Sequence, residues 1–305
     1  MPADHGHARS FTVDGNRVAA KALPGGLYVV ATPIGNLGDI TLRALATLAG
    51  ADLIACEDTR VSSVLTRHYG ITAKLTAYHE HNAATVRPKL LAALAAGKAV
   101  ALISDAGTPL VSDPGYRLVV EARAAGHKVV PIPGASAVLA ALVAAGLPTD
   151  AFFFAGFLPP KTVARAKRLK ELVAVPATLV FFESPQRVAA ALADMRDALG
   201  DREAVVAREL TKAFEETRSG TLASLAAEFA GKPTPKGEIV VVVAPPREEA
   251  VSAEDADRLL VSLLKEKGVS EAASEAAELT GLPRRELYRR ALALKDGTEK
   301  SDAGE

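Results

Sequence analysis

Short apolar runs alternate with longer helical patterns along the first half of the chain. The runs at 27–32, 52–56, 98–103 and 128–132 are rich in Val, Ile, Leu and Ala, which is typical of buried strands. Helical patterns follow them at 42–48, 83–96, 116–125 and 137–146. When strands and helices alternate strictly, the strands usually pair in parallel and helices cover the sheet. The first half therefore predicts a parallel α/β domain.

The pattern changes near residue 150. Apolar runs at 151–157, 177–183, 204–208 and 238–244 surround helical patterns at 185–199 and 222–230, which predicts a second α/β domain with a mixed sheet. After Pro245 and Pro246, three short helices are predicted at 253–267, 270–280 and 283–294, similar to a helix-turn-helix. We therefore predict a flexible tail over 1–25, domains over 26–149 and 150–246, and a helical appendage with a tail over 247–305.

Composition excludes several classes of protein. Lys and Arg total 36 and so do Asp and Glu, so no overall charge draws the protein to nucleic acid or membrane. No apolar run approaches the roughly 18 residues of a membrane span. The single cysteine, Cys56, cannot form an internal disulfide, and residues 1–24 lack the apolar run of a secretory signal. We expect a cytoplasmic protein with no membrane partner.

Three loops, at 33–39, 104–115 and 133–137, each follow a predicted strand. In a parallel sheet they emerge at one edge and form a crevice, and the loop at 104–115 is unusually long for such a connection. None of the three contains lysine or arginine. The crevice therefore suits a neutral or zwitterionic adenosine-like ligand better than a polyphosphate. Pro33 rules out the dinucleotide-binding glycine fingerprint there, whereas Glu57 and Asp58 could either receive ribose hydroxyls or cap the next helix.

Two further groups of residues are candidates for chemistry. His79 and His81 would share a face of an extended segment, but no third ligand accompanies them, so no metal site is predicted. Basic residues gather on two predicted helices, where they either bind an RNA backbone or form a solvated face. The candidates for RNA binding are Lys161, Arg165, Lys167, Arg168, Arg284, Arg285, Arg289 and Arg290.

Seven segments together resemble the RNA methyltransferases of the tetrapyrrole methylase superfamily. They lie at 27–41, 56–60, 104–115, 133–137, 156–161, 182–184 and 207–212, and the resemblance extends from Gly26 to Leu294. It implies two α/β domains of tetrapyrrole-methylase type with the cofactor cleft between them, followed by the small C-terminal helical appendage.

The resemblance also implies an activity and its partners. The cofactor would be S-adenosyl-L-methionine, and the reaction 2′-O-methylation of a decoding-centre cytidine, cytidine 1402, of 16S rRNA in the small ribosomal subunit, by a cytoplasmic homodimer. By motif, the cofactor-binding residues would be Pro33, Asp105, Ala106, Gly107, Thr108, Ser136, Ala137, Phe157, Glu183 and Leu210.

A ribose hydroxyl is a weak nucleophile, so a group that accepts its proton would accelerate the transfer. The hypothesis is that His79, Glu57 or Glu183 accepts this proton and that Arg60 or Lys161 orients a phosphate. Two other functions stay open. One is a methyltransferase of a tetrapyrrole or another small molecule, and the other is a non-catalytic RNA-binding or ribosome assembly protein.

Overall fold

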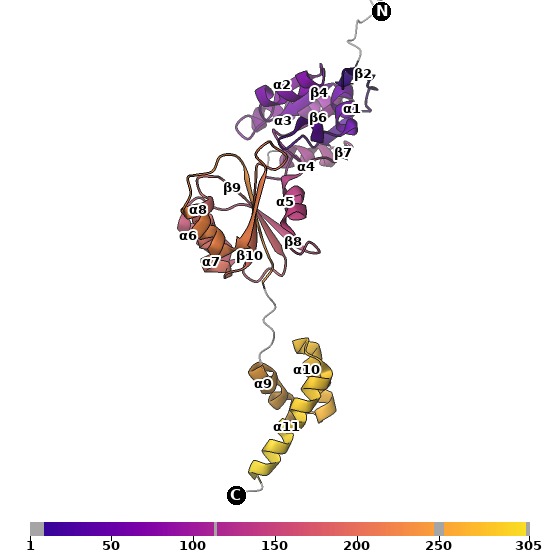
Figure 1. Ribbon diagram of the computed structural model, residues 1–305. Coiled ribbons are helices and arrows are strands. Elements are labelled where there is room, and N and C mark those ends of the chain that lie inside the picture. Colours follow the sequence, from indigo (N-terminus) through magenta and orange to yellow (C-terminus); the bar gives the residue numbers. More distant parts are fainter. Residues whose placement is uncertain (1–8, 113–114, 247–252, 303–305) are drawn as a thin grey trace, which may run out of the picture. The chain divides into compact units, whose positions relative to one another are not determined.

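The computed structural model describes residues 9–112, 115–246 and 253–302, with side chains described up to 295. Contacts divide the chain after Pro246 into two units, which are treated separately below (Figure 1). Within the described residues, the first unit contains two sheets of five strands and a small hairpin, and the second contains three helices.

The first sheet is entirely parallel, as predicted. Its strand order is β5 (Lys74–Ala77), β4 (Leu53–Cys56), β6 (Ala99–Leu102), β3 (Gly26–Val30) and β7 (Val129–Ile132). Successive side chains of a strand point to opposite faces of the sheet. Because successive residues of β3 are apolar, both faces of the sheet must be covered. Tyr28 and Val30 pack in the cluster under α1 (Leu42–Gly50) and α2 (Thr59–His68). Leu27 packs in the opposite cluster, under α3 (Ala83–Ala95) and α4 (Tyr116–Ala124).

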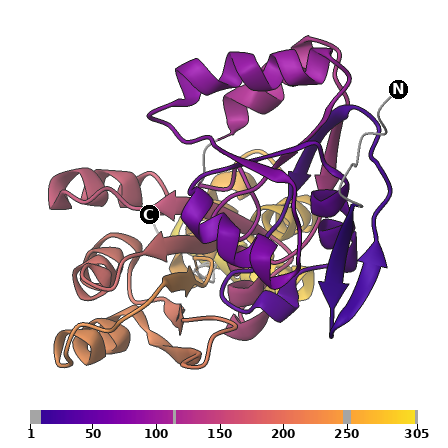
Figure 2. The same ribbon diagram turned by 90° about the horizontal axis from the view of Figure 1, so that it is seen from above.

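The prediction of a flexible tail is wrong for residues 10–19. They form a hairpin of β1 (Ser10–Val13) and β2 (Asn16–Ala19), drawn in indigo near the label N (Figure 2). Phe11 is buried in the cluster under α1, and the Thr12 amide donates to the Tyr69 carbonyl at 2.8 Å. Asp14 and Gly15 both adopt positive φ, as a two-residue hairpin turn requires, and this Asp-Gly pair was the signal in the sequence. Residues 1–8 lie outside the described residues.

The second sheet is mixed, as predicted. Its order is β11 (Glu216–Thr221), β10 (Glu203–Arg208), β12 (Ile239–Val243), β9 (Thr178–Glu183) and β8 (Phe152–Phe157), and only β8 and β9 are parallel neighbours. Strand β11 was not predicted. Its sequence, ETRSGT, is polar and half-buried or exposed because it lies at the edge of the sheet, so it carries no apolar pattern.

Helices cover both faces of the second sheet (Figure 1). On one face lie α6 (Thr162–Lys170), α7 (Val188–Leu199) and α8 (Leu222–Ala230), whose apolar residues pack with Phe181 and Val241. On the other lies α5 (Ala137–Ala145), whose Ala141 and Leu142 pack with residues of β9, β10 and β12. The predicted first domain, 26–149, includes this helix, but the helix packs on the second sheet. It therefore links the two domains.

The second unit consists of α9 (Ala253–Leu264), α10 (Val269–Thr280) and α11 (Arg284–Asp302). Gly281 ends α10 in the left-handed conformation, which lets the chain turn into α11. The core of the second unit is small, with Leu260, Ala273 and Leu287 fully buried. Over the part of the chain that the structure describes, no helix is both long and apolar enough to cross a membrane.

Candidate functional site

The three predicted loops meet at one edge of the first sheet, at the carboxyl ends of β3, β6 and β7. Thr32 and Gly107 exchange backbone hydrogen bonds of 2.9 and 3.1 Å, which join the first loop to the second. The Thr108 hydroxyl donates to the Ala135 carbonyl at 3.3 Å, which joins the second loop to the third. The loops therefore form one connected surface.

The backbone of the second loop is strained. Leu110 and Ser112 have φ of 72° and 64°, in the left-handed region that side chains disfavour, and Gly107 has φ of 76°. Each such non-glycine residue costs on the order of 1–3 kcal/mol, and residues of this kind cluster at functional sites. A Cβ on Gly107 would lie 3.3 Å from Ile34, so the glycine also permits close packing of the first two loops.

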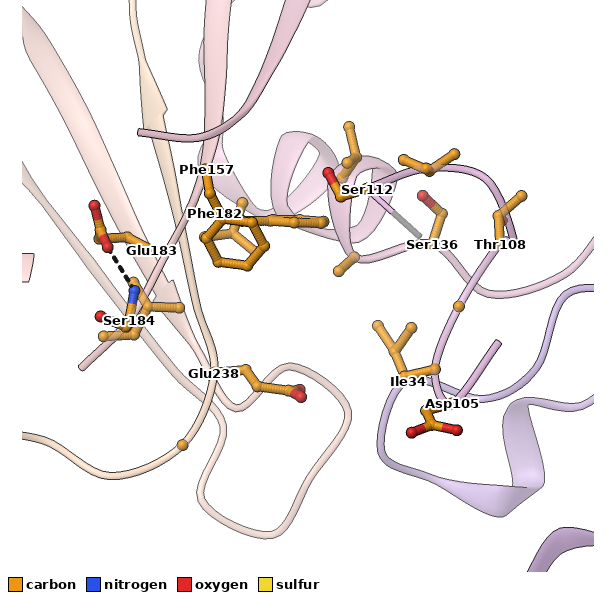
Figure 3. A pocket seen from close by; sticks show the side chains of 18 of the residues that line it. Ile34, Asp105, Thr108, Ser112, Ser136, Phe157, Phe182, Glu183, Ser184 and Glu238 are labelled. Atoms are coloured by element: carbon orange, nitrogen blue, oxygen red, sulfur yellow. Dashed lines mark hydrogen bonds between the residues drawn. The ribbon is translucent and has the colours of Figure 1, made fainter. Parts of the chain in front are cut away.

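A cavity of about 420 Å³, the first cavity, opens between these loops and the second sheet (Figure 3). The first domain and α5 contribute Ile34, residues 105–108, Val111, Ser112 and residues 136–138, and the second sheet contributes Phe157, residues 182–185 and residues 237–240. The ring centroids of Phe157 and Phe182 lie 5.5 Å apart in an edge-to-face arrangement. The second sheet therefore contributes two aromatic rings, whereas the polar side chains from the first domain and α5 are Asp105, Thr108, Ser112 and Ser136.

Glu183 lies in the wall but does not present its carboxylate to the cavity. Phe182 precedes it on β9, so the two side chains leave the strand on opposite faces. Its carboxylate accepts a hydrogen bond from the Ser184 amide at 2.7 Å (Figure 3). It also pairs at 2.7 Å with Arg187, the residue that precedes α7. Arg187 also donates to the Leu158 carbonyl at 3.3 Å. Glu183 therefore holds the ends of β8 and β9 together, and its predicted catalytic role is not supported.

A second cavity, of about 430 Å³, adjoins the first. It is lined by Thr32, Pro33, Ile34, Gly35, Leu37, Val61, Ser62, Val64, Leu65, residues 103–106, Lys212 and Glu238. Four residues line both cavities, namely Ile34, Asp105, Ala106 and Glu238. These shared residues mark the boundary at which a ligand in one cavity would meet a ligand in the other.

Asp105 is a carboxylate at this boundary. Its Oδ1 accepts a hydrogen bond of 3.0 Å from the Asp58 amide at the start of α2. Burial raises the pKa of Asp105, and the nearby Asp58 carboxylate raises it further, against the hydrogen bond from Asp58 and the charge of Arg60. Asp58 itself is paired with Arg60, whose guanidinium lowers the Asp58 pKa to about 2. Of these two neighbouring carboxylates, Asp105 therefore has the increased affinity for a proton and Asp58 has the decreased one.

Lys212 is held between two carboxylates. Its Nζ lies 2.7 Å from Glu209 and 3.0 Å from Glu238. Burial opposes its charge, but both carboxylates outweigh this effect and raise the pKa of Lys212. The stem of Lys212 lies against Gly35, where any Cβ would overlap it, so this lysine reaches the first loop from the second domain.

The predicted cofactor-binding and catalytic residues fall into three groups, which line the first cavity, the second cavity or neither. Eight predicted cofactor-binding residues line the first cavity, namely Asp105, Ala106, Gly107, Thr108, Ser136, Ala137, Phe157 and Glu183. Pro33 lines the second cavity, and Leu210 packs in the core beside Ile34 and lines neither. His79, Glu57 and Arg60 also line neither cavity, so the structure does not place these catalytic candidates at the site. Among the described residues, no cluster of three metal-ligating side chains occurs.

The two basic helices differ from the prediction. Arg165 is buried and pairs with Asp194 of α7 at 2.5 Å, so it holds α6 to α7 and cannot reach RNA. Lys161 and Lys167 are exposed, and Arg168 pairs with Glu171. On α11, Arg284 donates to Ser274 and Ser270 of α10, and Arg290 pairs with Asp257 of α9. Arg285 and Arg289 are exposed and have no ion-pair partner within the described part of the chain.

Among the lining residues that were not predicted are Ser112, Phe182, Lys212 and Glu238. Ser112, Phe182 and Lys212 lie inside the segments that carry the resemblance, and alternation along β9 could have identified Phe182 in place of Glu183. Lys212 and Glu238 come from distant segments of the chain, and no local pattern in the sequence predicts that they pair.

Comparison with protein families supports the resemblance. The model for "Tetrapyrrole (Corrin/Porphyrin) Methylases" matches residues 26–226, and that for the "RsmI C-terminal HTH domain" matches residues 249–295. The chain is 62% identical to ribosomal RNA small subunit methyltransferase I of Mesorhizobium japonicum, over 94% of this chain and 98% of that one. It is 51% identical to the protein of the same name from Pseudomonas aeruginosa, over 88% and 97%.

Solved structures share the fold at low sequence identity. Diphthine synthase superposes with a TM-score of 0.56 at 18% identity, over 72% of this chain and 89% of that one. A uroporphyrin-III C-methyltransferase from Thermus thermophilus, in complex with S-adenyl homocysteine, gives a TM-score of 0.51 at 19% identity, over 72% and 97%. The predicted fold, two α/β domains of tetrapyrrole-methylase type followed by helices, is confirmed.

Proposed function

The chain belongs to the tetrapyrrole methylase family, and from this premise we propose that it transfers a methyl group from S-adenosyl-L-methionine to small-subunit ribosomal RNA. At finer detail, we propose the 2′-hydroxyl of cytidine 1402 of 16S rRNA as the acceptor. The observation that supports a transfer reaction most directly is the pair of adjoining cavities with Asp105 at their shared boundary.

The first cavity fits this cofactor. Its volume, about 420 Å³, lies in the range usual for small-molecule sites. Phe157 and Phe182 would face the adenine, while Ser136 and the backbone of 105–108 would meet polar atoms. None of the described residues that line this cavity is lysine or arginine, which disfavours a polyphosphate.

When bound, S-adenosyl-L-methionine would supply a methyl group attached to a positively charged sulfur; a new bond from the ribose oxygen to the methyl carbon would replace the carbon–sulfur bond and leave a neutral thioether. The hydroxyl would lose its proton in the reaction. We propose Asp105 as the acceptor of this proton, because it lies at the boundary of both cavities and its pKa is raised. The walls act mainly by alignment, which is the largest contribution available to a displacement of this kind.

Two features favour RNA over a tetrapyrrole as acceptor. The relatives that cover almost the whole chain are named for ribosomal RNA, and the second unit matches a domain found with them. The second unit also exposes Arg285 and Arg289, which a small acceptor does not need. The homodimer and the cytoplasmic location stay predictions.

The test uses small ribosomal subunits from a strain that lacks this methylation. The purified protein is incubated with them and with methyl-labelled cofactor, and digested 16S rRNA is examined by mass spectrometry. We expect one 2′-O-methylated cytidine in the decoding centre. Label in another nucleotide would change the proposed acceptor, and bound cofactor without transfer would favour an assembly protein.

A further inference from the structure

Lys212 is the one lysine or arginine among the described residues that line either cavity. It lies on the loop between β10 and β11, where Glu209 and Thr211 adopt positive φ of 52° and 67°. Such strained positions persist only when their surroundings fix them. Gly237, with φ of 94°, is part of this support, because a Cβ there would overlap the Glu209 side chain. The fold thus places a single cation at the second cavity.

The two carboxylates that hold Lys212 differ in exposure. Glu209 is 17% exposed and also accepts a hydrogen bond from the Glu238 amide at 3.0 Å, so it is fixed. Glu238 is 72% exposed and lines both cavities. An exposed ion pair contributes little to stability, so another anion could replace the Glu238 carboxylate beside Lys212 at small cost.

Part of the lining of the second cavity is apolar. Val61 and Val64 of α2 are 44% and 53% exposed, and Leu37 and Leu65 line the same cavity. An exposed apolar surface beside one held cation suits a ligand with a flat or apolar body and a single negative charge. A nucleotide within an RNA chain has this character, since a base and sugar carry one phosphodiester charge.

Resting on the proposed function, we propose that the second cavity binds the acceptor nucleotide and that Lys212 contacts its 3′-phosphate in place of Glu238. The 3′-phosphate is attached to the carbon next to the one that bears the 2′-hydroxyl. A cation fixed on this phosphate therefore orients the hydroxyl toward Asp105 and the first cavity. The valines contact the base or sugar, and Lys212 selects a phosphodiester over an uncharged acceptor.

The test compares Lys212→Ala and Lys212→Arg with the wild type, using small subunits as acceptor. Cofactor affinity is measured by calorimetry and transfer by single-turnover rates. We expect Lys212→Ala to bind S-adenosyl-L-homocysteine within about twofold of wild type and to transfer about 100-fold more slowly, the usual cost of a misplaced reactant. Lys212→Arg should recover most of the rate. Lys232→Ala is the control, because Lys232 pairs with Glu228 at 2.6 Å and lines neither cavity.

A second variant guards against a change in folding. Glu238→Gln removes the competing carboxylate, so we expect a lower KM for small subunits, measured at saturating cofactor because Glu238 also lines the first cavity. The proposal is overturned if Lys212→Ala transfers at the wild-type rate, if it loses cofactor affinity to the same extent as rate, or if Glu238→Gln raises the KM. A wild-type protein that labels no RNA overturns the proposed function, and this assignment with it, whereas the first three outcomes leave the proposed function standing.

Discussion

The two units of the chain use positive charge in opposite ways. In the first unit, Lys212 is held between Glu209 and Glu238 at the second cavity, and Arg187 and Arg165 are each paired with a carboxylate. In the second unit, Arg284 and Arg290 join the helices, but Arg285 and Arg289 are exposed on α11 and have no ion-pair partner among the described residues. These three cations of the first unit are fixed by carboxylates, whereas two arginines of the second unit are left to solvent.

This difference separates alignment from attraction. A cation held by carboxylates has its position fixed and its long-range field largely cancelled, so it can orient a bound group but attracts little from a distance. Exposed arginines attract a polyanion and release its counterions, without fixing any one atom. Changes in the first unit should therefore alter turnover or cofactor affinity, whereas changes in the second should alter RNA affinity and its dependence on salt.

The largest effect is expected for Asp105→Asn. The amide cannot accept the hydroxyl proton, so with saturating cofactor the single-turnover rate should fall by about 10²–10⁴-fold. The carboxylate must be charged to act, and its pKa is raised. The wild-type rate should therefore fall as the pH is lowered through a value above the usual range for aspartate, and this decline should be absent in Asp105→Asn.

Asp58→Asn gives a sharper form of the same test. Asparagine can still cap α2, and burial, the main cause of the raised Asp105 pKa, is kept, but the smaller contribution of the Asp58 charge is gone. The acidic decline of the rate should move to lower pH while the maximal rate changes little. If the decline stays in place in Asp58→Asn, or persists in Asp105→Asn, another group controls the proton.

The edge of the first sheet was predictable because its signals are local. Strand, loop and helix follow one another along the chain, and parallel pairing then brings the loops together without further information. The loops that carry Asp105, Gly107 and Ser136 are predicted in this way, whereas the residues themselves are predicted from the resemblance. The hairpin at 10–19 had a local signal too, its Asp-Gly turn, but a polar segment near the terminus was interpreted as a tail.

The second sheet's contribution to the site was less predictable because it depends on tertiary packing. Glu238 and Lys212 are 26 residues apart, and only the antiparallel pairing of β10 with β12 brings them together. Arg165 looked like any exposed arginine of a basic helix, although it is paired inside the domain. Phe182, rather than Glu183, presents its side chain to the first cavity. Which of two neighbouring strand residues faces a cavity depends on which face of the sheet each helix covers, and the sequence of β9 alone does not determine this.

A smaller effect is expected for Phe182→Ala, in the aromatic wall of the first cavity. Removing a ring that a ligand would cover costs about 1.5–3 kcal/mol, so the affinity for S-adenosyl-L-homocysteine should fall about 10- to 100-fold. Calorimetry measures this, and thermal unfolding checks that the domain stays folded. Phe153→Ala is the control, because Phe153 is exposed on β8 and lines neither cavity. Equal losses in both variants would contradict an adenine site at Phe182.

The smallest effect is expected in the second unit, for Arg285→Glu combined with Arg289→Glu. The two side chains are four residues apart and share a face of α11, so both could contact one RNA backbone. RNA binding should weaken, and the slope of log affinity against log salt should fall by about 1 for each arginine, while cofactor affinity stays unchanged.

The control in that unit is Arg258→Glu on α9, where the arginine is 76% exposed but paired with Asp255. This single substitution changes the net charge of the second unit by the same amount as either Arg285→Glu or Arg289→Glu alone. If the salt slope depends only on net charge, Arg258→Glu will lower it as much as each α11 change does. If the face of α11 binds the RNA backbone, only the α11 pair will lower it. The first outcome would remove the assignment of this face while leaving the chemistry of the first unit untouched.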